Sequence, residues 1–460
     1  MEIIKKAKEQ TQREATNIIS SVSKIIRNVR MEGDHAIRKY NSMFDGNENE
    51  CFRVSREEIE RAYSKVDKIF IEDIKAAANN ITAFAKLQRA SAMVSIEEEI
   101  SPGVVLGHRK IPIEACCCYV PGGNYPLFST ALMLAIPAKI AGVGRVVACS
   151  PAIKESGNGN GNSNGNGGDN DWDRSRSAGS SGGSGSDNRS TSGGIHPLTL
   201  VAMDIAGIDE IYAIGGAQAI AAFAYGTSQI EPVDLIVGPG NKYVTEAKRQ
   251  CFGQIGIDFI AGPSEVLIIA DATANPKILA ADLLSQSEHD ISAKGILVTT
   301  SKETAKRVEI EIEKQLLSLQ TSKIAAQAWY DNGEILVAES LEQACELSNA
   351  YAPEHLELIV EEEDKLIPLL SNYGSLFIGE MSAEVFGDYV SGTNHTLPTS
   401  KAARYTGGVW VGTFIKTCTY QKLGKIGIEK LGPIASRMAK AEGLYAHANA
   451  ADIRLEIRKI

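Results

Sequence analysis

Short apolar segments that alternate with glycine turns and helical patterns constrain the fold of this chain more than any other feature. After Val104 these segments read ACCCYV, RVVACS, EIYAIGG, DLIVGPG, VLIIAD and GILVTT. Continuous apolar runs of this length are typical of parallel strands that are covered on both faces. Helical patterns lie between them, for example at 132–141 and 218–224. The alternation predicts an α/β fold with right-handed crossover connections.

The two ends of the chain have a different texture. Residues from about 5 to 95 are predicted to be helical, with an apolar stripe formed by Ile18, Ile19, Val22, Ile25, Ile26 and Val29. The stretch after about Arg404 is predicted to be extended and then helical, for example at 434–444. This stretch is short for an independent domain, which leaves a partner subunit as a surface on which it could pack.

Residues 155–194 stand apart from the rest of the chain. They consist mainly of Gly, Asn, Ser, Asp and Arg, and their only apolar side chains are Trp172 and Ala178. Such a composition cannot bury enough surface to offset the entropy lost on ordering. We predict a disordered surface insertion between a strand ending near Ser150 and a helix at 198–206, which could be deleted without loss of chemistry. A docking tether is the alternative.

Composition excludes several classes of protein. The chain has 460 residues, of which 43% are hydrophobic and 23% charged, as expected for a globular protein of two or three domains. Its net charge of -10 argues against a nucleic-acid surface. No apolar run reaches the roughly 18 residues of a membrane-spanning helix. The acid-containing N-terminal segment resembles neither a secretory signal nor a transit peptide, so a cytoplasmic location is expected.

Three consecutive cysteines, Cys116, Cys117 and Cys118, occupy one of the predicted strands. A thiolate metal or redox site is the functional interpretation. However, adjacent strand residues point to opposite faces of a sheet, and no CxxC spacing occurs. We therefore favour a buried structural strand.

Four side chains suited to a divalent metal lie in the second half of the chain. Gln286 and His289 are three residues apart in and after a predicted helix at 278–288, so both can project from one face. Asp388 and His447 supply a carboxylate and a second imidazole. A donor set of nitrogen and oxygen suits an ion such as zinc. From the residues alone, nothing but this chemistry links Asp388 and His447 to the helix.

Further candidates lie in loops. Glu354 and His355 are adjacent and could divide general-base and general-acid work, although a surface ion pair is the alternative. His395 follows Asp388 in a glycine-containing loop. Ser264 precedes a strand, either as a turn residue or as a substrate contact.

Glycine turns follow three of the predicted strands, in YVPGG, GGAQ and GPGN. Turns at the carboxyl ends of parallel strands are where α/β sheets bind nucleotides. Each one alone is also explained as a tight strand-to-helix connection, and no GxGxxG fingerprint occurs. Three such turns in one region favour a nucleotide site.

The order of these motifs resembles the histidinol dehydrogenase family. The family's order is kept by the segments YVPGG, NYPLFSTALMLAIPAKIAG, IGGAQAIAA, GPGNKYVTEAKR, AGPSEVLIIAD, DLLSQSEHD, APEHLEL, GDYVSGTNHTLPT and EGLYAHANA. The resemblance covers essentially the whole chain except 155–194. The resemblance implies oxidation of L-histidinol to L-histidine through the aldehyde, with two NAD molecules in turn and one zinc ion per subunit.

The resemblance also implies roles for individual residues. It makes Glu354 and His355 the catalytic pair. The implied zinc ligands, which also touch substrate, are Gln286, His289, Asp388 and His447. Further implied substrate contacts are Ser264, His355, His395 and Glu442, and the implied NAD contacts are Tyr119, Gln218 and Asn241.

The implied architecture is α/β, with two incomplete Rossmann-like parallel-sheet domains and helical N-terminal and C-terminal extensions. In detail, 1–30 would form an N-terminal extension, 31–118 with 265–405 a substrate and zinc domain, and 119–264 an NAD-binding domain that contains the insertion. Residues 406–460 would form a dimerisation tail that brings Glu442 and His447 into the partner's site of a homodimer.

Three other functions are compatible with the residues alone. A related zinc and NAD dehydrogenase could act on another polar alcohol, although Glu442 suits an amine-bearing substrate. A zinc hydrolase could use Glu354 to activate water. An inactive metal-binding scaffold would not require the full set of site residues.

Overall fold

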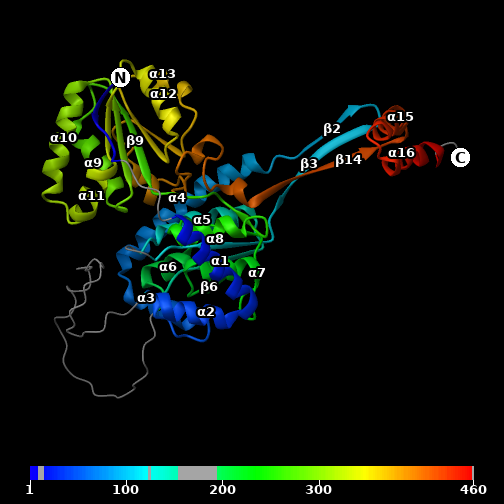
Figure 1. The fold of residues 1–460 in the computed structure, drawn as a ribbon, viewed down its shortest axis with the longest axis horizontal. Helices are drawn as coiled ribbons and strands as arrows, with labels where there is room; N and C mark the ends of the chain where they lie inside the picture. Colours follow the sequence, from blue (N-terminus) through cyan, green and yellow to red (C-terminus); the bar gives the residue numbers. More distant parts are fainter. Residues whose placement is uncertain (9–14, 123–125, 154–193, 458–460) are drawn as a thin grey trace.

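The computed structural model describes residues 1–8, 15–122, 126–153 and 194–457. Two α/β units lie one above the other, and a long arm leaves them on one side (Figure 1). The predicted α/β fold with two parallel sheets is thereby confirmed. The predicted insertion at 155–194 lies, apart from Gly194, outside the described residues.

The lower unit is built on a five-stranded parallel sheet with the spatial order β6-β5-β4-β7-β8. Its strands are β4 (Ala115–Tyr119), β5 (Arg145–Cys149), β6 (Glu210–Tyr212), β7 (Leu235–Val237) and β8 (Gly256–Ile257). The first strand in the chain is therefore central, and the connections reverse direction between β4 and β7. Such a reversal point is where open α/β sheets bind ligands.

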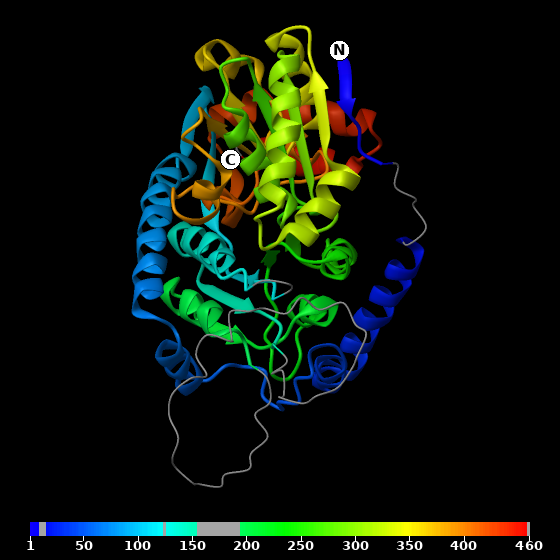
Figure 2. The same ribbon diagram turned by 90° about the vertical axis from the view of Figure 1, so that its left-hand side faces the viewer.

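Two layers of helices cover this sheet on opposite faces, and Figure 2 shows α4 and α1 on opposite sides of the unit. One face packs against α1 (Ala15–Glu32), α2 (Asp34–Tyr40), α7 (Gly216–Tyr225) and α8 (Lys242–Cys251). The other packs against α3 (Arg56–Lys65), α4 (Lys68–Ala92), α5 (Ser129–Ala141) and α6 (Pro197–Ile205). Within β4, Cys116 and Cys118 face one layer and Cys117 the other, all fully buried, as expected of a structural strand.

The upper unit repeats the same strand order. Its parallel strands β11-β10-β9-β12-β13 again place the first strand centrally, and β1 adds an antiparallel edge next to β11. The strands are β1 (Glu2–Lys5), β9 (Glu265–Ala270), β10 (Lys294–Thr299), β11 (Glu334–Val337), β12 (His355–Ile359) and β13 (Ser375–Ile378). The covering helices are α9 (Pro276–Ser287), α10 (Lys302–Leu316), α11 (Ser322–Asn332), α12 (Leu341–Tyr351) and α13 (Glu363–Leu366).

The packing differs from the expected domain division. Residues 31–118 were expected to join 265–405, but α2, α3, α4 and β4 all pack in the lower unit. The expected N-terminal helical extension begins instead with β1, in the upper sheet, before α1 packs on the lower one. The helical pattern of the first hundred residues could not show which sheet its apolar stripe would cover.

The arm consists of an antiparallel three-stranded sheet with two helices at its end (Figure 1). Its strands are β2 (Ile96–Ser101), β3 (Val104–Pro112) and β14 (Ile415–Leu423), and its helices are α15 (Lys425–Ala441) and α16 (Tyr445–Ile457). β14 pairs with β3 over its whole length, from Ile415 opposite Pro112 to Leu423 opposite Val104. An extended segment followed by helices was predicted here, and it is confirmed.

Two glycines allow close contact between the first helix of the arm and its three-stranded sheet. A Cβ atom on Gly103, which has a φ of +77°, would lie 2.4 Å from the Gly427 nitrogen, and one on Gly427 would lie 2.3 Å from the Gly103 oxygen. No side chain fits at either position, so the start of α15 rests directly on the turn between β2 and β3.

The remaining elements are short: α14 (Glu384–Tyr389), a π-helical turn (Asn41–Asp45), and single 3-10 turns at Ile367–Leu369, Ala402–Arg404 and Val411–Phe414. Within the described ranges, no helix has both the length and the apolar character that crossing a bilayer requires.

Candidate active site

The amino-terminal edge of the upper sheet gathers most of the predicted site residues. His355 is the first residue of β12, and Ser264 directly precedes β9. Gln286 lies in the last turn of α9, and His289 follows that helix before β10 begins. Asp388 lies on α14. Segments that lie more than one hundred residues apart in the sequence thus meet at one edge of the sheet.

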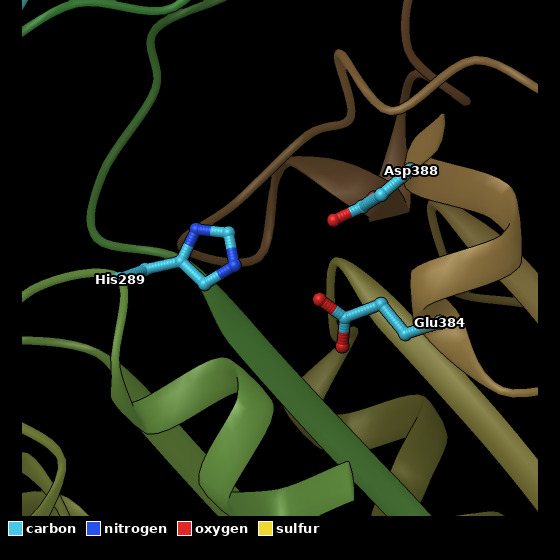
Figure 3. A group of neighbouring side chains, drawn as sticks. All are labelled: His289, Glu384 and Asp388. Atoms are coloured by element: carbon cyan, nitrogen blue, oxygen red, sulfur yellow. The ribbon is translucent and has the colours of Figure 1, made fainter. Parts of the chain in front are cut away.

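Two of these side chains and a third, Glu384, form a cluster with the donor chemistry of a metal site. A nitrogen of His289 and carboxylate oxygens of Glu384 and Asp388 lie within 4.8 Å of one another. Figure 3 shows the His289 ring facing the two carboxylates on α14. Glu384 and Asp388 are both buried. One imidazole and two carboxylates suit a divalent ion such as zinc.

Sequence reasoning missed Glu384. It precedes Asp388 by four residues, the spacing that places two side chains on one face of a helix. The same argument that joined Gln286 to His289 could therefore have found it, had the short helix at 384–389 been predicted.

His355 and Gln286 lie directly beside the cluster. The His355 Nδ1 atom donates a hydrogen bond to Gln286 Oε1 at 3.0 Å, because an amide oxygen can only accept. The other ring nitrogen, Nε2, lies 3.8 Å from Asp388 Oδ1. Among the described residues, His355 Nε2, Gln286 Nε2 and Glu384 Oε2 are buried without a hydrogen-bond partner. Buried polar atoms without partners are costly, so these three point to a bound group.

Glu354 also lies close to the His355 ring. Its Oε2 atom accepts the backbone N–H of Glu265 at 3.0 Å and lies 3.7 Å from His355 Nδ1. Burial raises the pKa of Glu354 well above its usual value, and the nearby charges of Glu265 and Asp388 add to the effect. A carboxyl with a raised pKa is suited to act as a general base near neutral pH.

Burial dominates the ionisation of the other groups. It raises the pKa of Asp388 to about 6 and that of Glu384 well above the usual range, where repulsion from Asp388 and Glu357 contributes. Burial lowers the pKa of His355 to about 3, with a further contribution from His289. His355 is therefore neutral at physiological pH. A divalent cation at this point would reverse the preference of the carboxyls for their protonated form.

His395 connects this edge to the lower unit. Its Nδ1 atom donates to the Asp388 backbone oxygen at 2.9 Å, and its Nε2 atom lies 3.2 Å from the Thr130 hydroxyl, in the first turn of α5. Asn394 also donates to the Met133 carbonyl of α5 at 2.6 Å. Burial lowers the pKa of His395 to about 4. Because α5 begins after the carboxyl end of β4, these contacts bring the carboxyl edge of the lower sheet to the amino edge of the upper one.

The three predicted nucleotide contacts lie at or near that carboxyl edge. Tyr119 ends β4, and its hydroxyl accepts the Gly216 N–H at 3.0 Å. Gln218 in α7 is buried, with its Nε2 atom 3.5 Å from Asn41 Oδ1 and its Oε1 atom without a partner among the described residues. Asn241 caps α8 by accepting the N–H groups of Tyr243 and Val244 at 3.0 and 3.2 Å.

Two predicted site residues lie far from the cluster within this chain. Glu442 directly follows α15 and His447 lies on α16, and both side chains are exposed; the two helices form the far end of the arm (Figure 1). The structure therefore places His289 and Asp388 in the cluster and Gln286 beside it, in contact with His355, and it leaves the fourth predicted ligand far away. Ser264 lies half-buried next to Glu265, close in the chain to the residue that holds Glu354.

Comparisons with known proteins match nearly the whole chain. The family model described as histidinol dehydrogenase matches residues 8–162 and 188–455, and the unmatched interval lies inside the low-complexity insertion. A histidinol dehydrogenase of Agrobacterium fabrum is 43% identical, over 97% of this chain and 94% of its own. One from Methanocaldococcus jannaschii is 41% identical, over 99% of both chains.

A solved structure extends the likeness to three dimensions. The crystal structure of histidinol dehydrogenase from Elizabethkingia anophelis has a TM-score of 0.85 and 38% sequence identity, and the match covers 99% of this chain and 95% of that one. The family model and these relatives agree over nearly the whole length. The chain belongs to the histidinol dehydrogenase family.

Proposed function

We propose that this protein oxidises L-histidinol to L-histidine through L-histidinaldehyde, with zinc and two molecules of NAD used in turn. The main support for the proposal is the contact between the amino edge of the upper sheet and the carboxyl edge of the lower sheet. The metal-suited cluster on the upper sheet faces the carboxyl edge of the lower sheet, where α/β folds bind nucleotides. A substrate held at the cluster would thus lie next to a nucleotide held on the lower sheet.

The residues present fit both groups. Gln286, His289 and Asp388 would hold the ion, with His447 from a second subunit. The buried, unpartnered carboxylate oxygen of Glu384 supports a cation at this point. The glycine turns before α7 and α8, together with Tyr119, Gln218 and Asn241, would hold the dinucleotide. When bound, zinc supplies an anchor for the imidazole and amine of the substrate, and NAD supplies the oxidant.

The catalytic pair would act in succession. His355 is neutral, and its hydrogen bond to Gln286 leaves the Nε2 lone pair free to accept the proton of the substrate hydroxyl. Glu354, with its raised pKa, would take a proton from the water that attacks the aldehyde in the second oxidation. Holding the aldehyde between the two units would keep it from escaping.

A homodimer would complete the site. The helices α15 and α16 lie at the end of the arm and expose the large apolar side chains of Ile434, Met438, Leu444 and Tyr445. Exposed apolar patches of this kind mark surfaces for association. In a dimer, Glu442 could pair with the substrate ammonium or imidazolium.

The test is formation of NADH, followed by its absorbance, after the full chain receives L-histidinol, NAD and zinc. We expect two NADH per histidinol. The His355→Asn variant should lose nearly all activity, and the matched control His35→Asn, an exposed histidine on α2, should keep it. Absence of NADH, or hydrolysis of an ester or amide instead, would refute the proposal. NADH formed only from a different polar alcohol would retain the chemistry but change the substrate.

A further inference from the structure

A buried ion pair lies beneath the turn that connects β7 to α8. Lys248, on α8, and Asp258, just after β8, are in direct contact, and their side chains are 3% and 1% exposed. Charged side chains are almost never this deeply buried unless they are paired. Because burial of either charge alone is costly, the pair needs further hydrogen bonds to be tolerated.

Two of those hydrogen bonds go to a single residue of the turn, Gly238. The Lys248 ammonium donates to the backbone oxygen of Gly238 at 2.9 Å, and Asp258 Oδ2 accepts the Gly238 N–H at 2.7 Å. Both polar atoms of a single residue are therefore held by the same ion pair. The remaining oxygen, Asp258 Oδ1, also accepts the Phe259 N–H at 2.8 Å, which fixes the carboxylate itself.

The conformation and close packing of Gly238 require glycine at this position. Its φ of +117° is a conformation that favours glycine, and a Cβ atom would lie 2.3 Å from the Tyr119 oxygen at the end of β4. Three residues further on, Asn241 caps α8. The turn is therefore fixed at its start by the ion pair and at its end by the helix cap.

The turn held by the Lys248–Asp258 pair lies at a position in the sheet where ligands bind. β4 and β7 are the strands between which the connections of the lower sheet reverse direction. A ligand at that point meets the turns that follow both strands and the first N–H groups of α8. The ion pair lies behind the turn and is buried, so it cannot itself touch a ligand on the open side.

We propose that Lys248 and Asp258 are positioning residues that hold the turn from Gly238 to Asn241 in the conformation that binds a dinucleotide. The inference deepens the proposed function and rests on its nucleotide site. Without the pair, the turn would have to be ordered at the moment of binding, and affinity for the dinucleotide would fall.

The experiment uses the full chain and two variants. Asp258→Asn removes one charge. The double variant Lys248→Gln with Asp258→Asn removes both, so it leaves no unpaired buried charge and keeps the protein folded if the single variant fails to fold. We expect the Kd for NADH, measured by its fluorescence, to rise at least tenfold in each folded variant. The Michaelis constant for NAD should rise similarly, and kcat at saturating NAD should change less than threefold.

Asp209→Asn is the matched control. Asp209 likewise binds a lysine ammonium, that of Lys139 at 2.6 Å, and a backbone N–H, that of Val146 at 2.8 Å, but at the amino edge of the same sheet. The Kd of the Asp209→Asn variant for NADH should stay at the wild-type value. Wild-type affinity in a folded double variant, or an equal loss in the control, would overturn the inference. Failure of the wild-type chain to bind NADH would instead refute the proposed function.

Discussion

The carboxylates of Glu384 and Asp388 project from successive turns of α14 toward the same nitrogen-bearing ring, that of His289. The residues that directly follow each of them, Val385 and Tyr389, are 46% and 42% exposed. This short helix therefore presents acids to the interior and apolar side chains to the outside. Its inner face makes a metal site possible, although only one of the two acids was expected there.

Replacement of Glu384 should weaken metal binding. We expect the Glu384→Ala variant to bind Zn²⁺ or Co²⁺ at least tenfold more weakly, because one of the two carboxylates that would neutralise the ion is lost. Competition with a chromophoric chelator measures the affinity. Glu380→Ala is the control, since Glu380 accepts the Asn275 N–H at 2.6 Å near the opposite edge of the sheet. Equal affinities in the two variants would show that Glu384 does not contribute.

Metal affinity should also fall in acid. Because the pKa of Asp388 is raised to about 6, its carboxyl is mostly protonated below that pH and must lose a proton to bind an ion. We expect the affinity for Zn²⁺ to decrease by up to about tenfold per pH unit below pH 6 from this group. A Zn²⁺ affinity that does not change between pH 5 and 7 would contradict this prediction.

The raised pKa of Asp388 also affects the stability of the metal-free protein, which should be higher in acid. A carboxyl with a raised folded-state pKa contributes stability at low pH that is lost as pH rises from about 4 to about 6. Thermal unfolding of metal-free Asp388→Asn should therefore show a smaller decline over this interval than the wild-type chain.

Glu354→Gln should separate the two oxidations. The amide cannot take a proton from water, so we expect oxidation of added L-histidinaldehyde to slow by roughly two orders of magnitude or more. Oxidation of L-histidinol to the aldehyde should be affected much less, since His355 accepts that proton. Single-turnover measurements on the two substrates distinguish the steps. Equal losses in both would rule out this division of labour.

Subunits should complement each other if the arm completes a partner's site. A heterodimer of Glu354→Gln and His447→Asn chains contains one site with both substitutions and one with neither. We expect such a preparation to recover up to about one quarter of wild-type activity when both chains are present in equal amounts and pair at random. Activity no greater than that of the two homodimers would place His447 outside the shared site.

Local patterns in the sequence were sufficient to predict most of the fold. The six apolar segments after Val104 all form buried strands. His289 lies in the cluster, and Gln286 contacts His355 beside it. Packing over long distances was not predictable. The stripe on α1 and the strand at Cys116 gave no sign of which sheet they would join. Likewise, the expected nucleotide turns lie on carboxyl edges, whereas the cluster formed at an amino edge.

The arm has a consequence for how the assembly comes apart. Its strands leave the core side by side, where Ile113 donates its N–H to the Phe414 oxygen at 3.0 Å, and both strands must move together. If two subunits exchange such arms, neither can withdraw alone without uncovering the other's apolar helices. Dissociation would then be a slow, concerted event. Mixed dimers should accordingly form during co-expression far more readily than from preassembled homodimers.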